Sequence, residues 1–260
     1  MKDKTTQTTF DLAGKVCVVI GAGLIGSEYA RRLALHNATV VVADLDTQKG
    51  EELAKEIGGT FIACDATKVA SVKNLVAEVV QTCGKVDGVV NAVYLRTKTH
   101  GMHFEDLPYE SFLEEVGLQS GPQFLTAREF GAVMKKQGNG SIVFVGSIYG
   151  ATAPRFELYE GSTIKPPAVE YAVAKGGLAT LTRYLAKYYA PFGVRVNMLS
   201  PGGVWNHQDK VFEEKFSQHA ILGNRMAVPE DLSPALVYLL SDASGYMTGQ
   251  NLTIDGGWTL

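Results

Sequence analysis

The chain alternates between short runs of apolar residues and longer segments in which apolar residues recur every three or four positions. The short runs are apolar on both faces, as in the strands of a buried parallel sheet. Strands are predicted at Lys15–Ile20, Ala38–Ala43, Thr60–Cys64, Gly88–Ala92, Ser141–Val145, Arg195–Leu199 and Leu252–Ile254. Helices are predicted at Ser27–His36, Val69–Cys83, Phe112–Lys136 with an interruption near Gly121 and Pro122, Glu170–Ala190 and Pro229–Ser241. This alternation predicts an α/β fold, a doubly wound parallel sheet with helices on both faces and ligands beyond the carboxyl ends of its strands.

Three segments fall outside this alternation. Residues 1–13 are predicted to form a flexible tail. Residues 149–169 are rich in Gly, Pro, Thr and charge, so an irregular loop over the ligand crevice is expected. Residues 203–222 show only weak helical periodicity, which suits a mobile cover of the same crevice. Because no repeat, linker or low-complexity segment separates the elements, residues 1–260 are interpreted as a single domain.

The predicted helix 170–190 carries the most distinctive pair of polar residues. Its apolar stripe consists of Tyr171, Ala174, Leu178, Leu181, Leu185 and Tyr188. Tyr171 and Lys175 are four residues apart, so a phenol and an ammonium lie on one helix face. A nearby cation can lower the pKa of a phenol into the range useful for proton transfer. The alternative is a packed tyrosine ring with the lysine in solvent.

A glycine-rich turn follows the first predicted strand. Gly21, Gly23 and Gly26 would let the backbone approach a pyrophosphate at the N-terminus of the next helix, with Leu24 and Ile25 between them. Asp44 ends the second strand, where a carboxylate accepts hydrogen bonds from the adenosine ribose and repels a 2′-phosphate. The sequence therefore predicts a dinucleotide site that prefers NAD over NADP, with Asp46 as the alternative ribose ligand.

Further polar residues stand at the ends of the other strands. Asp65, Asn91 and Ser147 each end a strand, so they are expected at the same edge of the sheet as Asp44. The Asp65 side chain either contacts the adenine or caps the next helix.

Composition excludes several other classes of function. The chain has 260 residues, 46% of them hydrophobic, and a formal charge of −3. Interspersed charges give no basic face for nucleic acid or an anionic membrane. Without an apolar run that spans a bilayer or a secretion signal, a cytoplasmic protein is expected. Cys17, Cys64 and Cys83 are interpreted as thiols, and the histidines, with His100 and His103 the nearest pair, show no metal-ligand spacing, so no metal is expected.

With these motifs assembled, residues 13–258 resemble the short-chain dehydrogenase/reductase family, whose members are single-domain Rossmann-fold oxidoreductases. Tyr171 and Lys175 match the family's YxxxK motif, Ser147 its catalytic serine, and Pro201-Gly202 its PG loop. The chain from Ser241 to Gly257 matches the C-terminal signature. The resemblance implies that Tyr171 is the general acid/base, that Lys175 lowers its pKa and holds the nicotinamide ribose, and that Ser147 hydrogen-bonds the reacting oxygen.

The resemblance also implies a cofactor site and an assembly. The expected cofactor residues are Gly21, Gly23, Leu24, Ile25, Gly26, Asp44, Asp65, Ala66, Asn91, Ala92, Tyr171, Lys175, Pro201, Gly202, Val204 and Asn206. Members of the family commonly pair through the helix that carries the catalytic tyrosine and the next helix, and a C-terminal strand joins a second interface. A homodimer or homotetramer is therefore expected.

The chain departs from the family pattern at several positions. Ile20 replaces the threonine of TGxxxGxG and the turn is one residue shorter, while NNAG becomes Asn91-Ala92-Val93-Tyr94. The helix asparagine of the family's proton relay has no counterpart, and Gly117 and Gln119 occupy its neighbourhood. Asn206 stands where a threonine often contacts the nicotinamide amide.

The long segment between Ser147 and Tyr171 bears on the substrate. Its Ala153–Glu157 and Tyr159–Gly161 sequences resemble members associated with bacterial surface-sugar and flagellin-glycan synthesis, including the legionaminic acid type. That resemblance implies a sugar or nucleotide-sugar substrate. The candidate substrate residues are Tyr94, Gln119 and Arg155; the arginine either clamps a phosphate or carboxylate or forms a salt bridge with Glu157.

The function expected from these residues is an NAD-dependent oxidoreductase that interconverts a secondary alcohol and a ketone. Two alternatives remain at this point. One is an enzyme that uses NAD transiently for epimerisation or dehydration. The other is an NAD-binding regulatory protein that kept the fold while the proton relay was lost.

Overall fold

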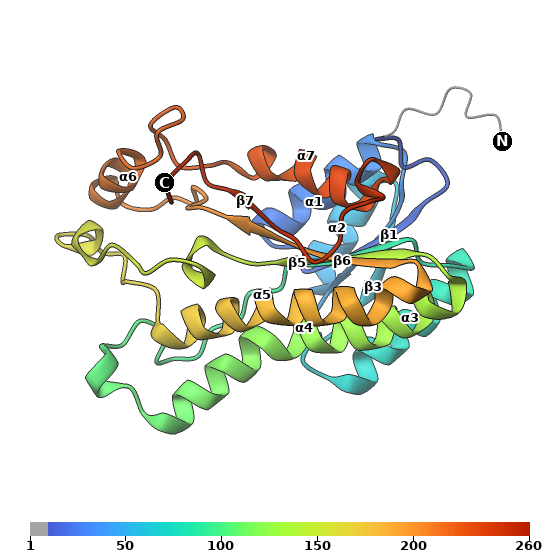
Figure 1. Cartoon of the computed structure of the whole chain (residues 1–260), viewed down its shortest axis with the longest axis horizontal. Helices are drawn as coiled ribbons and strands as arrows, with labels where there is room; N and C mark the ends of the chain where they lie inside the picture. Colours follow the sequence, from blue (N-terminus) through green and yellow to red (C-terminus); the bar gives the residue numbers. More distant parts are fainter. Residues whose placement is uncertain (1–9) are drawn as a thin grey trace.

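The computed structural model, which describes residues 10–260, has one seven-stranded sheet at its centre (Figure 1). All strands are parallel, in the order β3-β2-β1-β4-β5-β6-β7. The strands are β1 (Val16–Ile20), β2 (Thr39–Asp44), β3 (Thr60–Ala63), β4 (Gly88–Asn91), β5 (Gly140–Val145), β6 (Val194–Pro201) and β7 (Asn251–Ile254). The α-helices are α1 (Leu24–Leu35), α2 (Thr47–Ile57), α3 (Val69–Cys83), α4 (Tyr109–Gln137), α5 (Val169–Tyr189), α6 (Lys210–Ser217) and α7 (Pro229–Leu240).

Helices cover both faces of the sheet, as the alternating pattern predicts. One face packs against α1, α2 and α7 through residues such as Tyr29, Leu53 and Leu236. The other packs against α3, α4 and α5 through residues such as Leu75 and Phe130. Figure 1 shows these two layers on opposite sides of the strands. The doubly wound Rossmann fold is therefore confirmed.

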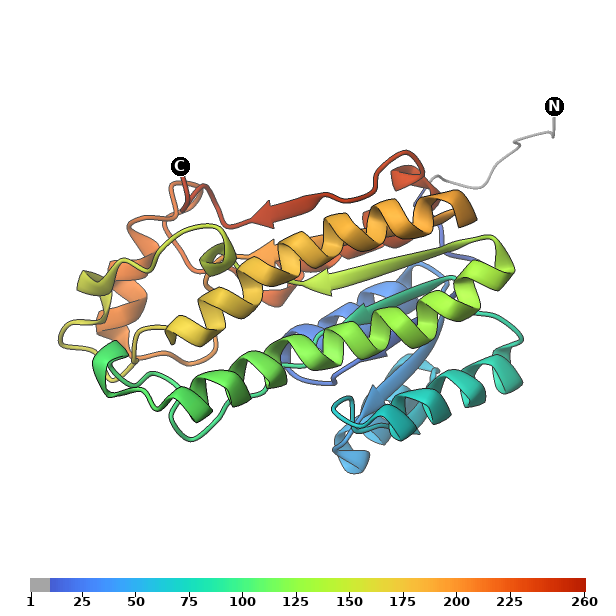
Figure 2. The same cartoon turned by 60° about the horizontal axis from the view of Figure 1, so that its bottom comes forward.

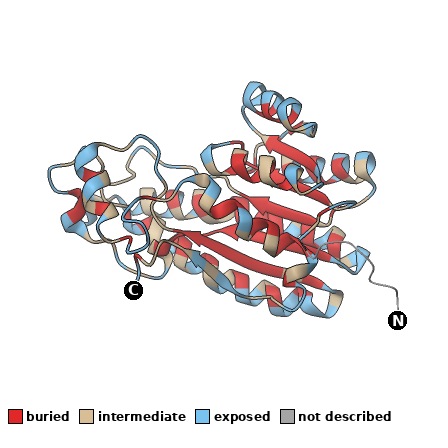
Figure 3. Cartoon of the chain, turned by 90° about the horizontal axis from the view of Figure 1, so that it is seen from above, coloured by how far each residue is buried: buried red, intermediate tan, exposed pale blue. Residues whose placement is uncertain are grey.

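The carboxyl ends of the strands all point to one end of the molecule. In Figure 2 the arrowheads of β5 and β7 point toward the end that carries α6 and the loop 149–169. Strand order reverses between β1 and β4, which pair directly although β2 and β3 intervene in the sequence. Such a reversal opens a crevice at the carboxyl edge. Figure 3 shows buried strands and, at this end, loops that are largely exposed.

The helix α4 is continuous, so the predicted interruption near Gly121 and Pro122 is wrong. Pro122 lies inside the helix and is buried. Its ring removes one backbone N–H, but its carbonyl accepts hydrogen bonds from Asn91 Nδ2 (3.1 Å) and Thr126 Oγ1 (2.8 Å). Burial of the helix against the core, for example at Phe130, stabilises it across the proline.

The buried stripe of α5 differs from the predicted one near the end of the helix. Tyr188 is 51% exposed, whereas the adjacent Tyr189 is 6% exposed and packs in the core. Tyr189 therefore takes the buried position that was predicted for Tyr188. The helix has 3.6 residues per turn, so its buried face gradually moves away from a repeat of three and four residues. Helix α2 was not predicted, although Asp46 caps its start, Gly58 ends it and Leu53 and Ala54 form its buried face.

The predicted flexible tail is too long at its C-terminal side. Residues 1–9 lie outside the described residues. Leu12 is fully buried, and its backbone N–H donates to the carbonyl of His36 at 2.8 Å. Residues 11–13 therefore belong to the folded domain, because they close the apolar face under α1.

Candidate active site

Two connected cavities occupy the crevice at the carboxyl edge of the sheet. We call the first, of about 870 Å³, the dinucleotide groove; it lies over the ends of β1, β2 and β3. We call the second, of about 670 Å³, the catalytic cavity; it is lined by Ser147, Tyr171 and Lys175. The two cavities share Ile25, Ala92, Val93, Tyr94, Val204, Asn206 and Gln208.

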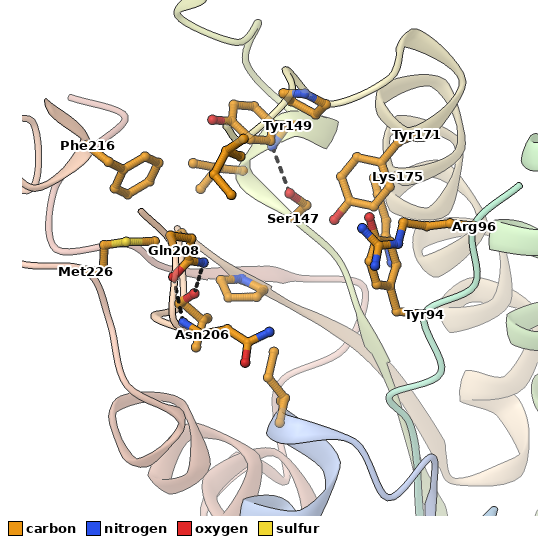
Figure 4. Close-up of a pocket in the computed structure, with 18 of the residues that line it drawn as sticks. Tyr94, Arg96, Ser147, Tyr149, Tyr171, Lys175, Asn206, Gln208, Phe216 and Met226 are labelled. Carbon is orange, nitrogen blue, oxygen red and sulfur yellow. Dashed lines mark hydrogen bonds between the residues drawn. The ribbon is translucent and has the colours of Figure 1, made fainter. Parts of the chain in front are cut away.

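The three predicted catalytic side chains converge on the catalytic cavity (Figure 4). Ser147 follows β5, and its Oγ accepts a hydrogen bond from Tyr149 N at 3.1 Å. The Tyr171 hydroxyl points toward Ser147. Lys175 is 4% exposed, and its Nζ lies 5.5 Å from the Tyr171 ring centroid. The Nζ group donates to the Val145 carbonyl at 2.8 Å.

Two glycines allow α5 to approach the segment after Ser147. A Cβ at Gly150 would lie 2.7 Å from the Lys175 carbonyl carbon, and one at Gly176 would lie 3.3 Å from Gly150 O. Both contacts are too close for an undisturbed side chain. This close approach brings the Ser147 and Tyr171 hydroxyls together. A Cβ at Gly177, by contrast, would meet nothing within 4 Å.

Burial dominates the electrostatics of the Tyr171–Lys175 pair. It lowers the pKa of the Lys175 ammonium to about 8. It also raises the pKa of the Tyr171 phenol, and the hydrogen bond from Ser147 lowers this pKa only in part. The expected lowering of the phenol pKa by Lys175 is therefore not seen in this structure. Charged forms are destabilised in a site with little water, and this desolvation is the largest influence on the phenol pKa.

The glycine-rich turn fits the pyrophosphate of a dinucleotide. A Cβ on Gly26 would collide with the carbonyl oxygen of Gly21, so a glycine is needed to close the turn. A Cβ on Gly23 would meet no protein atom within 4 Å, and the residue lines the groove. The first amides of α1, from Leu24 to Gly26, have no intrahelical acceptor. Backbone donors beside open space form the usual cradle for a phosphate.

Three carboxylates line the dinucleotide groove, at Asp44, Asp46 and Asp65. The Asp44 carboxylate accepts hydrogen bonds from the backbone N–H groups of Ala22 and Asp46, so it also ties β2 to the glycine turn. Asp46, the alternative ribose ligand, caps α2 by accepting from Lys49 N at 3.1 Å. An ionised carboxylate can accept about four hydrogen bonds, so Asp44 retains capacity for a ribose hydroxyl.

Asp65 caps a turn and still faces the groove. Its Oδ1 accepts from Thr67 N (2.9 Å) and Thr67 Oγ1 (2.6 Å). The hydrogen bond from the Thr67 hydroxyl lowers the pKa of Asp65. The N-cap of α3 is Lys68, so Asp65 does not cap that helix itself.

Most of the other expected cofactor residues line the cavities. They are Gly21, Leu24, Ile25, Ala66, Ala92, Pro201, Gly202, Val204 and Asn206. Gly26 and Asn91 line neither cavity, and the Asn91 side chain is fully buried and points away from the groove. Its Nδ2 donates to Thr126 Oγ1 at 2.8 Å and its Oδ1 accepts from Val93 N at 3.0 Å. The Asn91 amide therefore holds β4 against α4.

Of the three candidate substrate residues, only Tyr94 lines the cavities, whereas Gln119 and Arg155 do not. Tyr94 lines both cavities, with its ring edge-on to Tyr171 at a centroid distance of 5.7 Å. Gln119 lies behind the cavity wall, where its Nε2 donates to the Leu95 carbonyl. Gly117 is exposed on α4, and neither Gly117 nor Gln119 lines the cavities.

Of the two interpretations made from the sequence for Arg155, the salt bridge with Glu157 is wrong and the anion clamp stays a prediction. The guanidinium carbon of Arg155 lies 5.3 Å from the ring centroid of Trp258, and the residue does not line the catalytic cavity. Within residues 10–260 it forms no salt bridge with Glu157. A cation over an indole face gains stabilisation without a carboxylate partner.

Sequence reasoning missed a hydrogen-bonded group in the lining of the catalytic cavity. His100 lines the catalytic cavity, its Nδ1 lies 2.9 Å from Glu115 Oε1 and its Nε2 lies 3.3 Å from the Tyr94 hydroxyl. Glu115 is fully buried. The spacing of 15 residues carries no local signal, although an acidic residue at a buried helix position would have been a clue.

Two further observations concern other classes of site. Among residues 10–260, no cluster of three or more His, Cys, Asp or Glu side chains is arranged to hold a metal ion. Every helix in the same range is too short or too polar to cross a lipid bilayer. The three cysteines are free thiols, with Cys17 and Cys64 buried.

Comparison with known proteins agrees with this geometry. Residues 21–259 match a protein-family model described as enoyl-(acyl carrier protein) reductase. Post-translational flagellin modification protein A of Campylobacter coli is 33% identical over 257 residues, which cover 96% of this chain and 100% of that protein. A short chain dehydrogenase/reductase of Aspergillus oryzae is 30% identical, with 98% of each chain covered.

A solved structure extends the comparison to the fold. A short chain dehydrogenase from Leptospira borgpetersenii with bound NAD+ matches with a TM-score of 0.84 and 29% identity, covering 100% of this chain and 99% of that one. The family match spans nearly the whole chain, and the Ser147, Tyr171 and Lys175 side chains meet in one cavity. The chain therefore belongs to the short-chain dehydrogenase/reductase family, whose members are oxidoreductases that act on alcohols and ketones with NAD(P).

Proposed function

We propose that this protein is an NAD-dependent oxidoreductase that interconverts a secondary alcohol and a ketone on a sugar or nucleotide-sugar. The observation that carries the proposal is the meeting of the Ser147 and Tyr171 hydroxyls in a cavity that opens into the dinucleotide groove. The bound nicotinamide would supply the acceptor or donor of the hydride. The flagellin-modification relative supports a hydroxylated substrate, and side chains such as Tyr94, Arg96 and Gln208 provide hydrogen-bonding groups for it within a largely apolar cavity lining.

In this proposal the reacting oxygen of the substrate lies between Ser147 and Tyr171. The Ser147 hydroxyl donates a hydrogen bond to that oxygen and stabilises the charge that develops on it. Tyr171 exchanges the proton. Because burial raises the pKa of its phenol, Tyr171 is protonated at neutral pH in this structure and is ready to act as the acid in carbonyl reduction.

Asp44 and the neighbouring carboxylates support the preference for NAD. The dinucleotide groove is lined by three aspartates and by no Lys or Arg. A 2′-phosphate placed there would meet like charge and no cation, whereas ribose hydroxyls would find acceptors.

We also infer a homodimer or homotetramer that assembles through the outer face of α5. Val173, Tyr184 and Tyr188 are 48%, 69% and 51% exposed on this helix, which lies beside α4 on one side of the molecule (Figure 2). Exposed aromatic residues on one helix face favour association. Light scattering should give the mass of two or four chains, and the mass of a single chain would contradict the inference.

Replacement of Tyr171 by Phe tests the catalytic assignment. The variant should lose turnover by at least about 100-fold, because it removes the proton-transfer group, and should bind NADH as the wild-type protein does. Turnover is measured from nicotinamide absorbance on a panel of alcohols and sugars. Tyr184→Phe, an exposed tyrosine on the same helix, is the matched control. Wild-type turnover in Tyr171→Phe, or product formation without net change in absorbance, would refute the proposal.

Replacement of Asp44 by Ala tests the cofactor preference. The ratio of kcat/KM with NAD to kcat/KM with NADP should fall by about ten-fold or more, since about 1.4 kcal/mol of discrimination corresponds to ten-fold. Asp46→Ala is the control; it should cost about 1 kcal/mol of stability as a lost N-cap and leave the ratio unchanged. If Asp46→Ala changes the ratio and Asp44→Ala does not, the ribose ligand is Asp46.

The buried ammonium of Lys175 predicts a specific dependence of stability on pH. Its pKa is about 8 in the folded protein and 10.5 in a free lysine, so between these values the unfolded chain binds a proton that the folded chain does not. The stability of the wild-type protein relative to Lys175→Met should therefore rise with pH across this window, by roughly 3 kcal/mol in total. Below about pH 8 the difference should be constant.

Urea unfolding at several pH values measures this difference. Lys187→Met, which removes an exposed lysine from the same helix, should show no such rise between the two pKa values. A difference between wild type and Lys175→Met that does not change with pH would show that the ammonium is not desolvated.

A further inference from the structure

The two connected cavities carry opposite charge. Three carboxylates and no Lys or Arg line the dinucleotide groove. The catalytic cavity is lined by Arg96, Lys165 and Lys175, and by no Asp or Glu. Lys175 is already assigned to catalysis, so Arg96 and Lys165 are the cations that the reaction does not use.

Arg96 is not neutralised by the protein. Its guanidinium carbon lies 5.4 Å from the ring centroid of Tyr94, and within residues 10–260 no carboxylate oxygen lies within 4 Å of its nitrogen atoms. Figure 4 shows its side chain beside Tyr94 and next to Tyr171, directed into the cavity. Arg96 does not line the dinucleotide groove, so it faces the substrate side of the site.

The loop that carries Arg96 is anchored on the buried carboxylate of Glu115. This carboxylate accepts a hydrogen bond from Thr97 N at 2.6 Å, the residue after Arg96, and lies 2.9 Å from His100 Nδ1. Gln119 Nε2 donates to it at 3.2 Å. Burial alone would raise the pKa of Glu115, but these hydrogen bonds outweigh it and the pKa is lowered. The Glu115 carboxylate is thus fully engaged by the loop and does not pair with Arg96.

We propose that the substrate carries an oxyanion group, a phosphate or a carboxylate, which binds to Arg96 at the mouth of the catalytic cavity, with Lys165 as a second cation. This inference deepens the proposed function and rests on it. The guanidinium presents a planar fork of N–H donors that matches phosphate and carboxylate oxygens. An anion could bind there without displacing an ion pair of Arg96 with any of residues 10–260. Arg96 therefore takes the role of anion clamp, which was one of the two roles that the sequence suggested for Arg155.

The test is calorimetry on the NADH-saturated protein, so that the cofactor phosphates already occupy their own site. The probes are inorganic phosphate, glucose 6-phosphate, glucuronate and glucose. At least one of the three oxyanions should bind, and glucose should bind more weakly than that oxyanion. Arg96→Ala should weaken oxyanion binding about 10- to 100-fold, as expected for loss of a hydrogen bond to a charged group, and Arg96→Lys by less. The stronger of glucose 6-phosphate and glucuronate identifies the group.

Lys98→Ala is the matched control, because Lys98 is an exposed cation on the same loop that lines neither cavity. It should bind the oxyanions as the wild-type protein does. The inference is overturned if no oxyanion binds to the wild-type protein, if glucose binds as tightly as the oxyanions, or if Arg96→Ala binds them unchanged. NADH affinity, measured on the same samples, should be equal in all variants. Failure of the protein to bind NADH or to oxidise any alcohol would instead refute the proposed function.

Discussion

The hydrogen bond from Lys175 Nζ to the Val145 carbonyl is the contact on which the catalytic geometry depends. It joins α5, which carries Tyr171, to the end of β5, which leads into Ser147. The glycines at 150 and 176 allow the same two segments to pack at backbone distance. The cost of this arrangement is a desolvated ammonium with a lowered pKa. The desolvated ammonium lowers the stability of the folded protein, while the same contact holds the Ser147 and Tyr171 hydroxyls close together. Such a local loss of stability is common at functional sites.

The elements that depend on local pattern could be predicted from the sequence. All seven strands lie within two residues of their predicted positions, because short apolar runs in a doubly wound sheet are buried on both faces and have few alternatives. The Tyr171 and Lys175 pair was predictable for a similar reason, since four residues along a helix fix a shared face. Helix α4 was mispredicted at Pro122 because its buried packing and the hydrogen bond from Asn91 are contacts between distant segments.

The rest of the site depends on contacts that no local pattern encodes. Which arginine lines the catalytic cavity depends on which loop faces it, and Arg96 lines it whereas Arg155 does not. The guanidinium of Arg155 instead packs on the indole of Trp258, about 100 residues away in the chain. The spacing of Tyr171 and Lys175 indicated their attraction, but it could not indicate how little water the folded site would contain. Desolvation depends on the complete tertiary structure, so the sequence could not indicate that the pKa of the Tyr171 phenol is raised and not lowered.

The anchoring of the segment after β4 has a consequence for how such an enzyme can diversify. The carboxylate of Glu115 binds a backbone amide at Thr97 and the imidazole of His100, and it forms no ion pair with the side chain of Arg96. The residue at 96 can therefore change while the path of the loop is kept. Relatives could acquire new substrate preferences by exchanging this one side chain, with the hydride-transfer machinery left intact.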